Sequence, residues 1–231
     1  MKQFAGLHLY LVRHGESANN ALPDHQRVAD PGLTQLGQKQ AQHLATHYVD
    51  FGQIDHVLAS PFRRTLQTAQ PLLDARQSRA SIWTDIYEVG GCFSGYELSS
   101  FSGEPGMTDV EIGREFPQFD IPDDIDENGW YKSQPFESWE IATERARLQA
   151  KKIRDSFEGN DNVVFCFIHA DFKQLLLQQL VPQQKEYHDG GISNSSVTHI
   201  HFDNNVGSVV DYCNTDHLQS GDCLLYTSPS P

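Results

Sequence analysis

Arg13, His14 and Gly15 stand directly after the apolar run from Leu7 to Val12, which indicates a buried strand. A guanidinium and an imidazole are thus placed side by side, and the glycine lets the backbone pass close to a ligand. Neutral imidazole is a good nucleophile, and an arginine side chain can hold two oxygens of one phosphate group. The triplet therefore suits attack on a phosphoryl group, with nearby positive charge lowering the pKa of His14 from its usual value of about 6.5.

Two further short strands are followed by basic or titratable side chains. The segment from Ser60 to Arg64 follows residues 56–59, and His169 follows the run from Val163 to Ile168. The carboxyl ends of parallel strands lie along one edge of a sheet, where α/β proteins bind their ligands. We therefore expect these side chains to meet the first arginine and histidine at one site.

Strands and helices alternate along the chain. Thr34 is a suitable N-cap for a helix that ends near Phe51, and Ser60 with Pro61 is expected to begin a helix that runs to about Gln77. This alternation predicts an α/β fold, a three-layer sandwich with a mostly parallel central sheet flanked by helices. The other expected elements are strands at 81–86, 197–202 and 206–212, a helix from about Pro135 to Phe157 and a helix from Phe172 to Leu180.

Two stretches interrupt the alternation. Residues 94–137 hold eleven acidic residues and two basic ones, and their glycine and proline content predicts an irregular insertion that covers the site as an acidic cap. Residues 221–231 are polar and rich in proline, so we expect a disordered tail. The prediction is one domain over residues 1–220 with the insertion inside it.

Charge and composition exclude several classes of protein. The 231 residues carry a formal net charge of −14, which disfavours partners such as nucleic acid or an anionic membrane. The longest apolar run has six residues, too few to cross a bilayer, and no cleavage site for a leader is evident. Four cysteines without C-x-x-C spacing favour a reducing compartment, and we expect a soluble cytoplasmic protein with a buried thiol at Cys166.

Two histidine pairs have spacings that a metal site could use. His43 and His47 are four apart on an expected helix, and His199 and His201 are two apart on an expected strand. Neither pair is accompanied by a zinc motif, so we expect exposed polar faces and no bound metal.

Several motifs resemble, in order, those of the histidine phosphatase superfamily, in the branch of the phosphoglycerate mutases and fructose-2,6-bisphosphatases. LVRHGESANN is similar to the family signature, DPGLTQLGQKQA to its L-T-x-x-G-x-x-Q-A element and SPFRRTLQTA to its S-x-x-x-R-A-x-x-T-A element. IYEVGG carries the family glutamate, FCFIHADF the second histidine, and NSSVTHIHF and NTDHL resemble the last strands. The similarity covers roughly residues 7–218 apart from the acidic insertion.

The resemblance implies roles for individual residues. His14 is the expected nucleophile that becomes phosphohistidine, and Arg13 clamps the transferred phosphoryl group. The register of the second motif selects Arg64 over Arg63 and matches Thr68 to the family threonine. Asn20, His169 and Ala170 are expected to contact the phosphate, Glu88 is the expected proton donor, and no cofactor is implied.

The acid is less clearly defined than the nucleophile. In another branch of the superfamily an aspartate directly after the second histidine donates the proton, whereas here Asp171 is one residue further on and Ala170 replaces the usual glycine. We expect Asp171 to cap the helix that begins there or to face its dipole, and Glu88 to be the acid with a pKa above about 4.3. Substitution of asparagine for each of Glu88 and Asp171 in turn would separate the two assignments.

Three functions fit this pattern. The insertion, with two bases against eleven acids, would repel polyanions within a screening length of about 8 to 10 Å. We therefore predict a metal-independent phosphatase for a small or singly phosphorylated molecule, with a phosphopeptide as another possible substrate. The alternatives are a phosphoglycerate mutase and a non-catalytic binding protein of the same fold.

Overall fold

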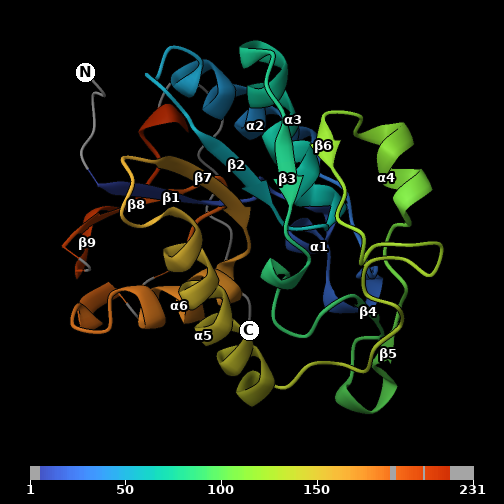
Figure 1. The fold of residues 1–231 in the computed structure, drawn as a ribbon. Coiled ribbons are helices and arrows are strands. Elements are labelled where there is room, and N and C mark those ends of the chain that lie inside the picture. Colours follow the sequence, from blue (N-terminus) through green and yellow to red (C-terminus); the bar gives the residue numbers. More distant parts are fainter. Residues whose placement is uncertain (1–5, 188–190, 205, 219–231) are drawn as a thin grey trace.

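A seven-stranded sheet forms the middle layer of the computed structural model, which describes residues 6–187, 191–204 and 206–218 (Figure 1). Its first five strands run parallel, and the last two are antiparallel to their neighbours. In spatial order the strands are β6 (Phe119–Asp120), β3 (Ala80–Ile82), β2 (His56–Ala59), β7 (Val163–Ile168), β1 (Leu7–Arg13), β8 (Val197–Asp203) and β9 (Val206–Asn214). The mostly parallel sheet confirms the predicted fold class.

Helices cover both faces of the sheet, because the central strands are apolar on both sides. Along β7, Phe165 and Phe167 belong to the core beneath α2 (Gln35–Tyr48) and α3 (Arg63–Arg76). The alternate residues of β7, including the buried Cys166, belong to the core beneath α5 (Trp139–Phe157) and α6 (Ala170–Leu180). The helix pairs on opposite faces, visible in Figure 1, give the three predicted layers.

The predicted start of α2 is confirmed and that of α3 is wrong. Thr34 caps α2, since its hydroxyl accepts a hydrogen bond from the backbone N–H of Gly37 at 3.1 Å. The N-cap of α3 is Phe62, whose side chain makes no capping hydrogen bond. Ser60, two residues before this N-cap, does not cap the helix. Its hydroxyl is instead hydrogen-bonded to the ring of His169 at 2.8 Å.

Three other expected boundaries also shift. Residues 135–138 are not helical, so α5 begins at Trp139, with Ser138 as its cap. The strand expected over 81–86 ends at Ile82 and is followed by a 3₁₀ turn, Thr84–Ile86. The helix expected from Phe172 already starts at Ala170, since His169 occupies its N-cap.

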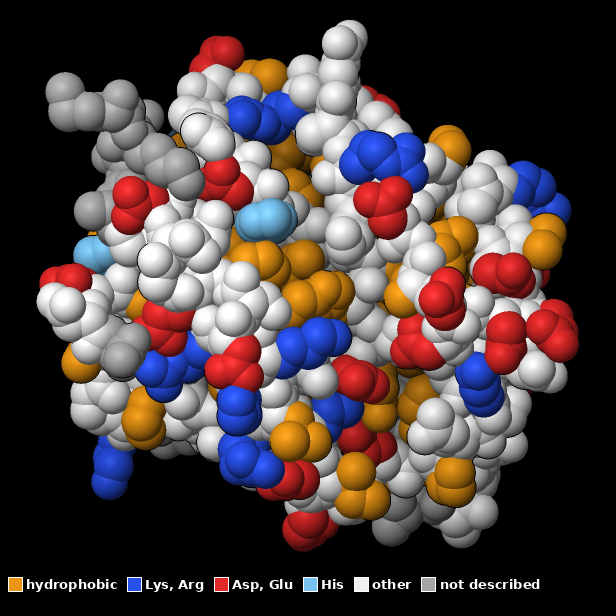
Figure 2. Space-filling model, in the orientation of Figure 1, with side chains coloured by type: hydrophobic (Ala, Val, Ile, Leu, Met, Phe, Trp, Pro, Cys, Tyr) orange, Lys and Arg blue, Asp and Glu red, His pale blue; other side chains and the backbone are white. Residues whose placement is uncertain are grey.

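The segment 94–137 contains short regular elements and is attached to the main core. It comprises part of β4 (Phe93–Ser94), a 3₁₀ turn (Leu98–Ser100), β5 (Ser102–Gly103), α4 (Asp109–Glu115) and β6, which pairs with β3. Trp130 and Tyr131 are 2 % exposed and belong to the core. Figure 2 shows acidic side chains gathered where the chain after β6 lies, and residues 120, 123, 124 and 127 are exposed.

The remaining elements are short. They are α1 (Ala18–Ala21) and the 3₁₀ turns Asp24–Gln26, Lys185–Tyr187 and Asp216–Leu218. The expected tail at 221–231 lies outside the described residues.

Candidate active site

His14 lies at the carboxyl end of β1 with its ring held at both nitrogens. Its Nδ1 is 2.7 Å from the carbonyl oxygen of Gly15, and the Nε of Arg64 donates to its Nε2 at 3.2 Å. These partners assign the proton to Nδ1 and the lone pair to Nε2. Because a guanidinium binds phosphate oxygens, a phosphoryl group held by Arg64 would lie against the Nε2 of His14.

The loop that carries His14 is shaped by close packing against the start of α2. A Cβ on Gly37 would lie 2.0 Å from the carbonyl oxygen of Glu16, so a side chain at this position would push the loop away. Thr34 donates to the carboxylate of Glu16 at 2.7 Å, and Gln40 accepts from its backbone N–H at 2.8 Å. The L-T-x-x-G-x-x-Q pattern therefore supports the loop that carries the histidine.

Arg64 is buried in the first turn of α3, at 8 % exposure. Its guanidinium lies 3.9 Å from the centre of the Phe62 ring. The carboxylate of Asp30 accepts from the backbone N–H of Arg63 at 2.9 Å and so replaces the missing cap of this helix. The side chain of Arg63 instead pairs with Glu115, outside the cavity.

A loop before β8 completes the floor around Arg13 and His14. Arg13 donates to the carbonyl oxygen of Ile192, and the Asn194 amide donates to the His14 carbonyl oxygen at 3.1 Å. The same amide reaches the Asn20 side-chain oxygen at 3.2 Å. The predicted residue Asn20 therefore lines the cavity and is tied to the floor beneath His14.

His169 and Ala170 are not among the residues that line the cavity, whereas the sequence predicts them at the phosphate. His169 has 0 % exposure, and its ring meets that of His14 edge-on with 5.2 Å between centres. Its Nε2 is 2.8 Å from the hydroxyl of Ser60. His169 is the N-cap of α6, and Ala170, the first residue of that helix, is half-buried.

Burial and positive charge keep both imidazoles neutral. The pKa of His14 is lowered well below its usual value by burial and then by Arg64 and Arg13. Burial is also the first cause of the lowered pKa of His169, followed by Arg64. A neutral His14 has its Nε2 lone pair available at neutral pH.

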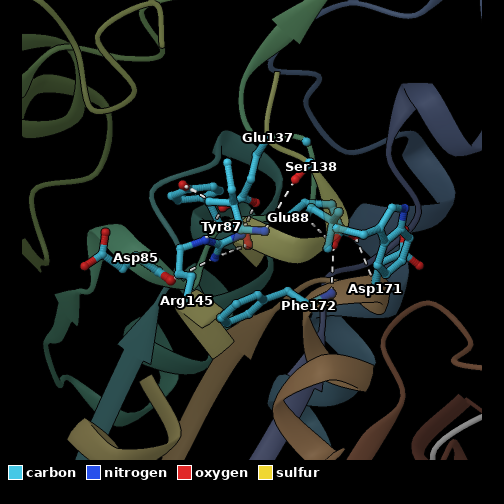
Figure 3. A network of polar contacts seen from close by, with 12 residues as sticks. Asp85, Tyr87, Glu88, Glu137, Ser138, Arg145, Asp171 and Phe172 are labelled. Atoms are coloured by element: carbon cyan, nitrogen blue, oxygen red, sulfur yellow. Dashed lines mark hydrogen bonds and ion pairs between the residues drawn. The ribbon is translucent and has the colours of Figure 1, made fainter. Parts of the chain in front are cut away.

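Glu88 borders the cavity and faces the first turn of α6 (Figure 3). Its carboxylate accepts from the backbone N–H of Phe172 and of Val89, both at 2.9 Å. Burial, followed by repulsion from Asp171, raises its pKa to about 7. Glu88 can therefore hold a proton near neutral pH and release it to a leaving oxygen.

Asp171 lies beside Glu88 and also borders the cavity. Of its two expected roles, capping α6 is wrong, since His169 is the N-cap. The other is confirmed, because Asp171 is in the first turn, where a carboxylate faces the helix dipole. Burial raises the pKa of Asp171 as well. The two neighbouring carboxyl groups disfavour each other's ionisation.

A buried ion pair holds the chain segment that carries Glu88. Arg145 on α5 contacts both carboxylate oxygens of Glu137, at 2.8 and 2.6 Å. It also donates to the carbonyl oxygens of Asp85 and Tyr87, at 2.9 and 3.0 Å (Figure 3). Since Tyr87 directly precedes Glu88, this arginine fixes the backbone from which the carboxyl group projects.

The site opens into a cavity of about 370 Å³. Its inner part, here called the phosphate end, is formed by Arg13, His14 and Arg64. None of the eleven acidic residues at 94–137 borders it; the acidic residues of its lining are Asp24, Glu88 and Asp171. The electrostatic argument based on an acidic cap is therefore not supported by the lining.

Several residues of the site escape sequence reasoning. Asp30 and Asn194 lie in expected loops, where the sequence does not indicate their partners. Glu137 and Arg145 are eight residues apart, and their pairing depends on α5 beginning at Trp139, which the sequence does not predict. The proline and glycine after Asp30 signal a turn but not which helix the carboxylate would cap.

The histidine pairs are less exposed than predicted. His199 is half-buried, and the centre of its ring lies 4.2 Å from that of the Tyr10 ring. Its Nε2 is 2.9 Å from the Nδ1 of His8. His47 is exposed and lies near His217. Within the described residues, no three metal-binding side chains come together, and no described helix is long and apolar enough to span a bilayer.

Known proteins share both the sequence pattern and the fold. The profile of the histidine phosphatase superfamily (branch 1) matches residues 9–215. The "Probable phosphoglycerate mutase GpmB" of Erwinia tasmaniensis is 44 % identical over 99 residues, which are 42 % of this chain and 46 % of that protein. The match thus spans less than half the length of this relative.

Two solved structures have the same fold at low sequence identity. A mutant phosphoserine phosphatase from Entamoeba histolytica, in complex with phosphoserine, superposes with a TM-score of 0.62 at 20 % identity, covering 92 % of this chain and 99 % of that one. The α-ribazole phosphatase of Shigella flexneri superposes with a TM-score of 0.60 at 21 % sequence identity, covering 90 % of this chain and 96 % of that one. With the family profile matched over nearly the whole described chain, the protein belongs to branch 1 of the histidine phosphatase superfamily.

Proposed function

We propose that the protein is a phosphomonoester hydrolase that works through a phosphohistidine on His14. The observation that carries this proposal is the contact of Arg64 with the Nε2 of His14, whose Nδ1 is held by Gly15. It places a neutral nucleophile and a permanent cation at the buried end of a cavity. Phosphoryl transfer requires mainly this positioning and charge neutralisation, so no cofactor is needed.

The reaction proceeds in two displacements. In the first, the Nε2 lone pair of His14 forms the N–P bond while the ester P–O bond breaks, and Glu88 gives its proton to the leaving oxygen. In the second, Glu88 takes a proton from water as the water oxygen attacks phosphorus, and the N–P bond breaks to release inorganic phosphate. The raised pKa of Glu88, about 7, suits both directions of proton transfer.

Arg13 and Arg64 hold the phosphoryl oxygens in this scheme, with Asn20 at the edge. Their burial, at 6 % and 8 % exposure, strengthens charge-assisted hydrogen bonds to the transition state. His169 acts from behind by supporting the ring of His14, since it lies edge-on to that ring.

We further propose one domain over residues 1–220, with the insertion at 94–137 covering the cavity. Gly95, Tyr96 and Phe101 from the insertion line the cavity, which supports this assignment. The described cysteines Cys92, Cys166 and Cys213 are free thiols, which supports a cytoplasmic location.

Phosphate release from a panel of small phosphomonoesters tests the proposal. We expect turnover by the purified protein, loss of turnover in His14→Ala, inhibition by vanadate and no effect of a chelator. Turnover that survives in His14→Ala, or that requires a metal, would contradict the mechanism. No turnover of any phosphomonoester would favour a non-catalytic binding protein.

A phosphoglycerate mutase is the second candidate, because the relative from Erwinia tasmaniensis carries that description. The cations that border the cavity are Arg13, Arg64 and Arg27, and Arg27 is paired with Asp24 at 3.0 Å. This leaves no free basic side chain among the described lining for a second phosphate or a carboxylate. Conversion of 3-phosphoglycerate to its 2-isomer faster than release of phosphate would establish the mutase instead.

A further inference from the structure

Five aromatic side chains of the cavity lining are here called the aromatic end. They are Phe93, Tyr96, Phe101, Phe136 and Trp139. We propose that this end is a subsite for the leaving group and that the substrates are small phosphomonoesters of apolar, aromatic alcohols. The inference rests on the proposed function, since it assigns the substrate class of the same cavity.

Three of the rings form a cluster that is only half-buried. The ring centres of Phe93 and Phe101 are 4.6 Å apart, those of Phe93 and Phe136 are 4.8 Å apart, and those of Phe101 and Phe136 are 4.6 Å apart. Phe93 and Phe136 meet almost perpendicularly, at 86°. Rings packed in this way present both faces and edges to a further aromatic group.

The backbone holds these rings in place before a ligand arrives. Phe93 pairs with Gly103 in the small sheet of β4 and β5, which positions Phe101 beside it. A Cβ on Gly90 would come within 2.7 Å of the Phe136 ring, so this glycine allows the ring to pack on the backbone after Glu88. A preformed site loses little entropy on binding.

The aromatic end is continuous with the candidate acid. Glu88, Val89, Gly91 and Phe93 all line the cavity and follow one another along the chain. A group bonded to the oxygen that receives the proton of Glu88 would therefore extend along this wall toward the rings. The leaving group is the only part of a phosphomonoester that occupies such a position.

Charge excludes a strongly anionic leaving group. Arg27 is paired with Asp24 at 3.0 Å, and Glu88 and Asp171 also line the cavity. A carboxylate on the leaving group would meet these two carboxyl groups without a described free cation to offset them. An uncharged ring would exchange water for contact with the aromatic side chains.

The test compares alkyl phosphates whose alcohols have similar acidity, so that leaving-group chemistry does not determine the result. We expect kcat/KM for 2-phenylethyl phosphate to exceed that for propyl phosphate and for phosphoserine by about tenfold or more. In Phe101→Ala the ratio of phenylethyl to propyl phosphate should fall by about tenfold, and in Phe101→Leu by less. Phe51→Leu, a half-buried ring packed on Tyr10 and Phe165 outside the cavity, is the matched control and should keep the ratio.

Binding of phosphonates that cannot be hydrolysed makes the result independent of turnover. Tighter binding of 2-phenylethylphosphonate than of propylphosphonate, lost in Phe101→Ala, supports the subsite even if no ester is hydrolysed. Equal kcat/KM for the phenylethyl and propyl esters, or equal binding of the two phosphonates, would overturn the subsite. Equal turnover would leave the proposed phosphatase intact, whereas absent turnover with selective binding would contradict the phosphatase alone.

Discussion

The phosphate end and the aromatic end of the cavity are built in different ways. The phosphate end lies at the carboxyl ends of central strands, and its side chains, Arg13, His14 and Arg64, are less than a tenth exposed. The aromatic end is carried by the segment after Glu88 and by the first residue of α5, and Tyr96 and Trp139 are 58 % and 52 % exposed. The difference indicates that the rigid sheet fixes the chemistry, whereas the attached segment selects what is bonded to the phosphate.

Loss of Arg64 should have the largest effect, because it disables the phosphate end for every substrate. In Arg64→Met we expect kcat/KM to fall by about 10³ for phenylethyl and propyl phosphate alike, since the cation beside the Nε2 of His14 is gone. Steady-state release of inorganic phosphate measures kcat/KM for both esters.

The adjacent arginine supplies the matched control. Arg63 is on the same helix but pairs with Glu115 outside the cavity, so Arg63→Met should change kcat/KM by less than about threefold. A loss in Arg63→Met equal to that in Arg64→Met would show that the helix, and not the cation, matters.

Glu88 lies between the two ends, and its removal should have the next largest effect. In Glu88→Gln we expect kcat to fall by about 10² to 10³. Glu88 must be protonated for the first displacement, so kcat/KM of the wild type should decline as pH rises through about 7, the pKa of Glu88. A pH–rate profile measures this limb, which Glu88→Gln should lack.

Asp171→Asn distinguishes the two carboxyl groups. Repulsion from Asp171 raises the pKa of Glu88, so its removal should move the alkaline limb to lower pH and lower kcat/KM by less than about tenfold. If Asp171→Asn abolishes turnover while Glu88→Gln does not, Asp171 is the acid.

A smaller effect on activity is expected from Arg145, which supports Glu88 from behind. In Arg145→Met, Glu137 would be left as a buried charge without its partner, so we expect a loss of about 3 to 5 kcal/mol in the free energy of unfolding. Activity at low temperature should fall by about tenfold because the backbone at Tyr87 is released. Urea unfolding and the pH–rate profile are the measurements.

An exposed pair on the same helix is the comparison for Arg145. Arg147 pairs with Glu144 at 2.6 Å with both side chains more than half exposed. Arg147→Met should cost less than about 1 kcal/mol and leave the pH profile unchanged. Restoration of stability in the double variant Arg145→Met with Glu137→Gln would confirm that the unpaired carboxylate causes the loss.

The phosphate end was predictable because each of its residues follows a strand whose apolar run is evident. His14 and Arg64 come within hydrogen-bond distance because the parallel strands β1 and β2 end at the same edge of the sheet. The start of α3 was not predictable, since Ser60 gives its hydroxyl to His169 and Asp30 from a distant loop provides the cap. Local propensity could not reveal either long-range contact.

The aromatic end was hidden by composition. Eleven acidic residues dominate residues 94–137 and suggested a charged cover over the site. In the structure the Glu111 carboxylate accepts from the backbone N–H of Thr108 at the start of α4, and Glu115 pairs with Arg63. Phe101 and Phe136 line the cavity. Net charge does not reveal which side chains face inward, because that depends on how the segment packs.

Rapid mixing with a phosphomonoester, followed by a quench that avoids acid and by mass spectrometry, tests the central claim most directly. The account predicts the mass of one PO₃H group on the peptide that contains His14 during turnover, and its absence in His14→Ala. The adduct should form more slowly in Glu88→Gln, where the leaving oxygen lacks its proton donor and the attacking water lacks its base. Wild-type turnover without any adduct on His14 at any quench time would contradict the account.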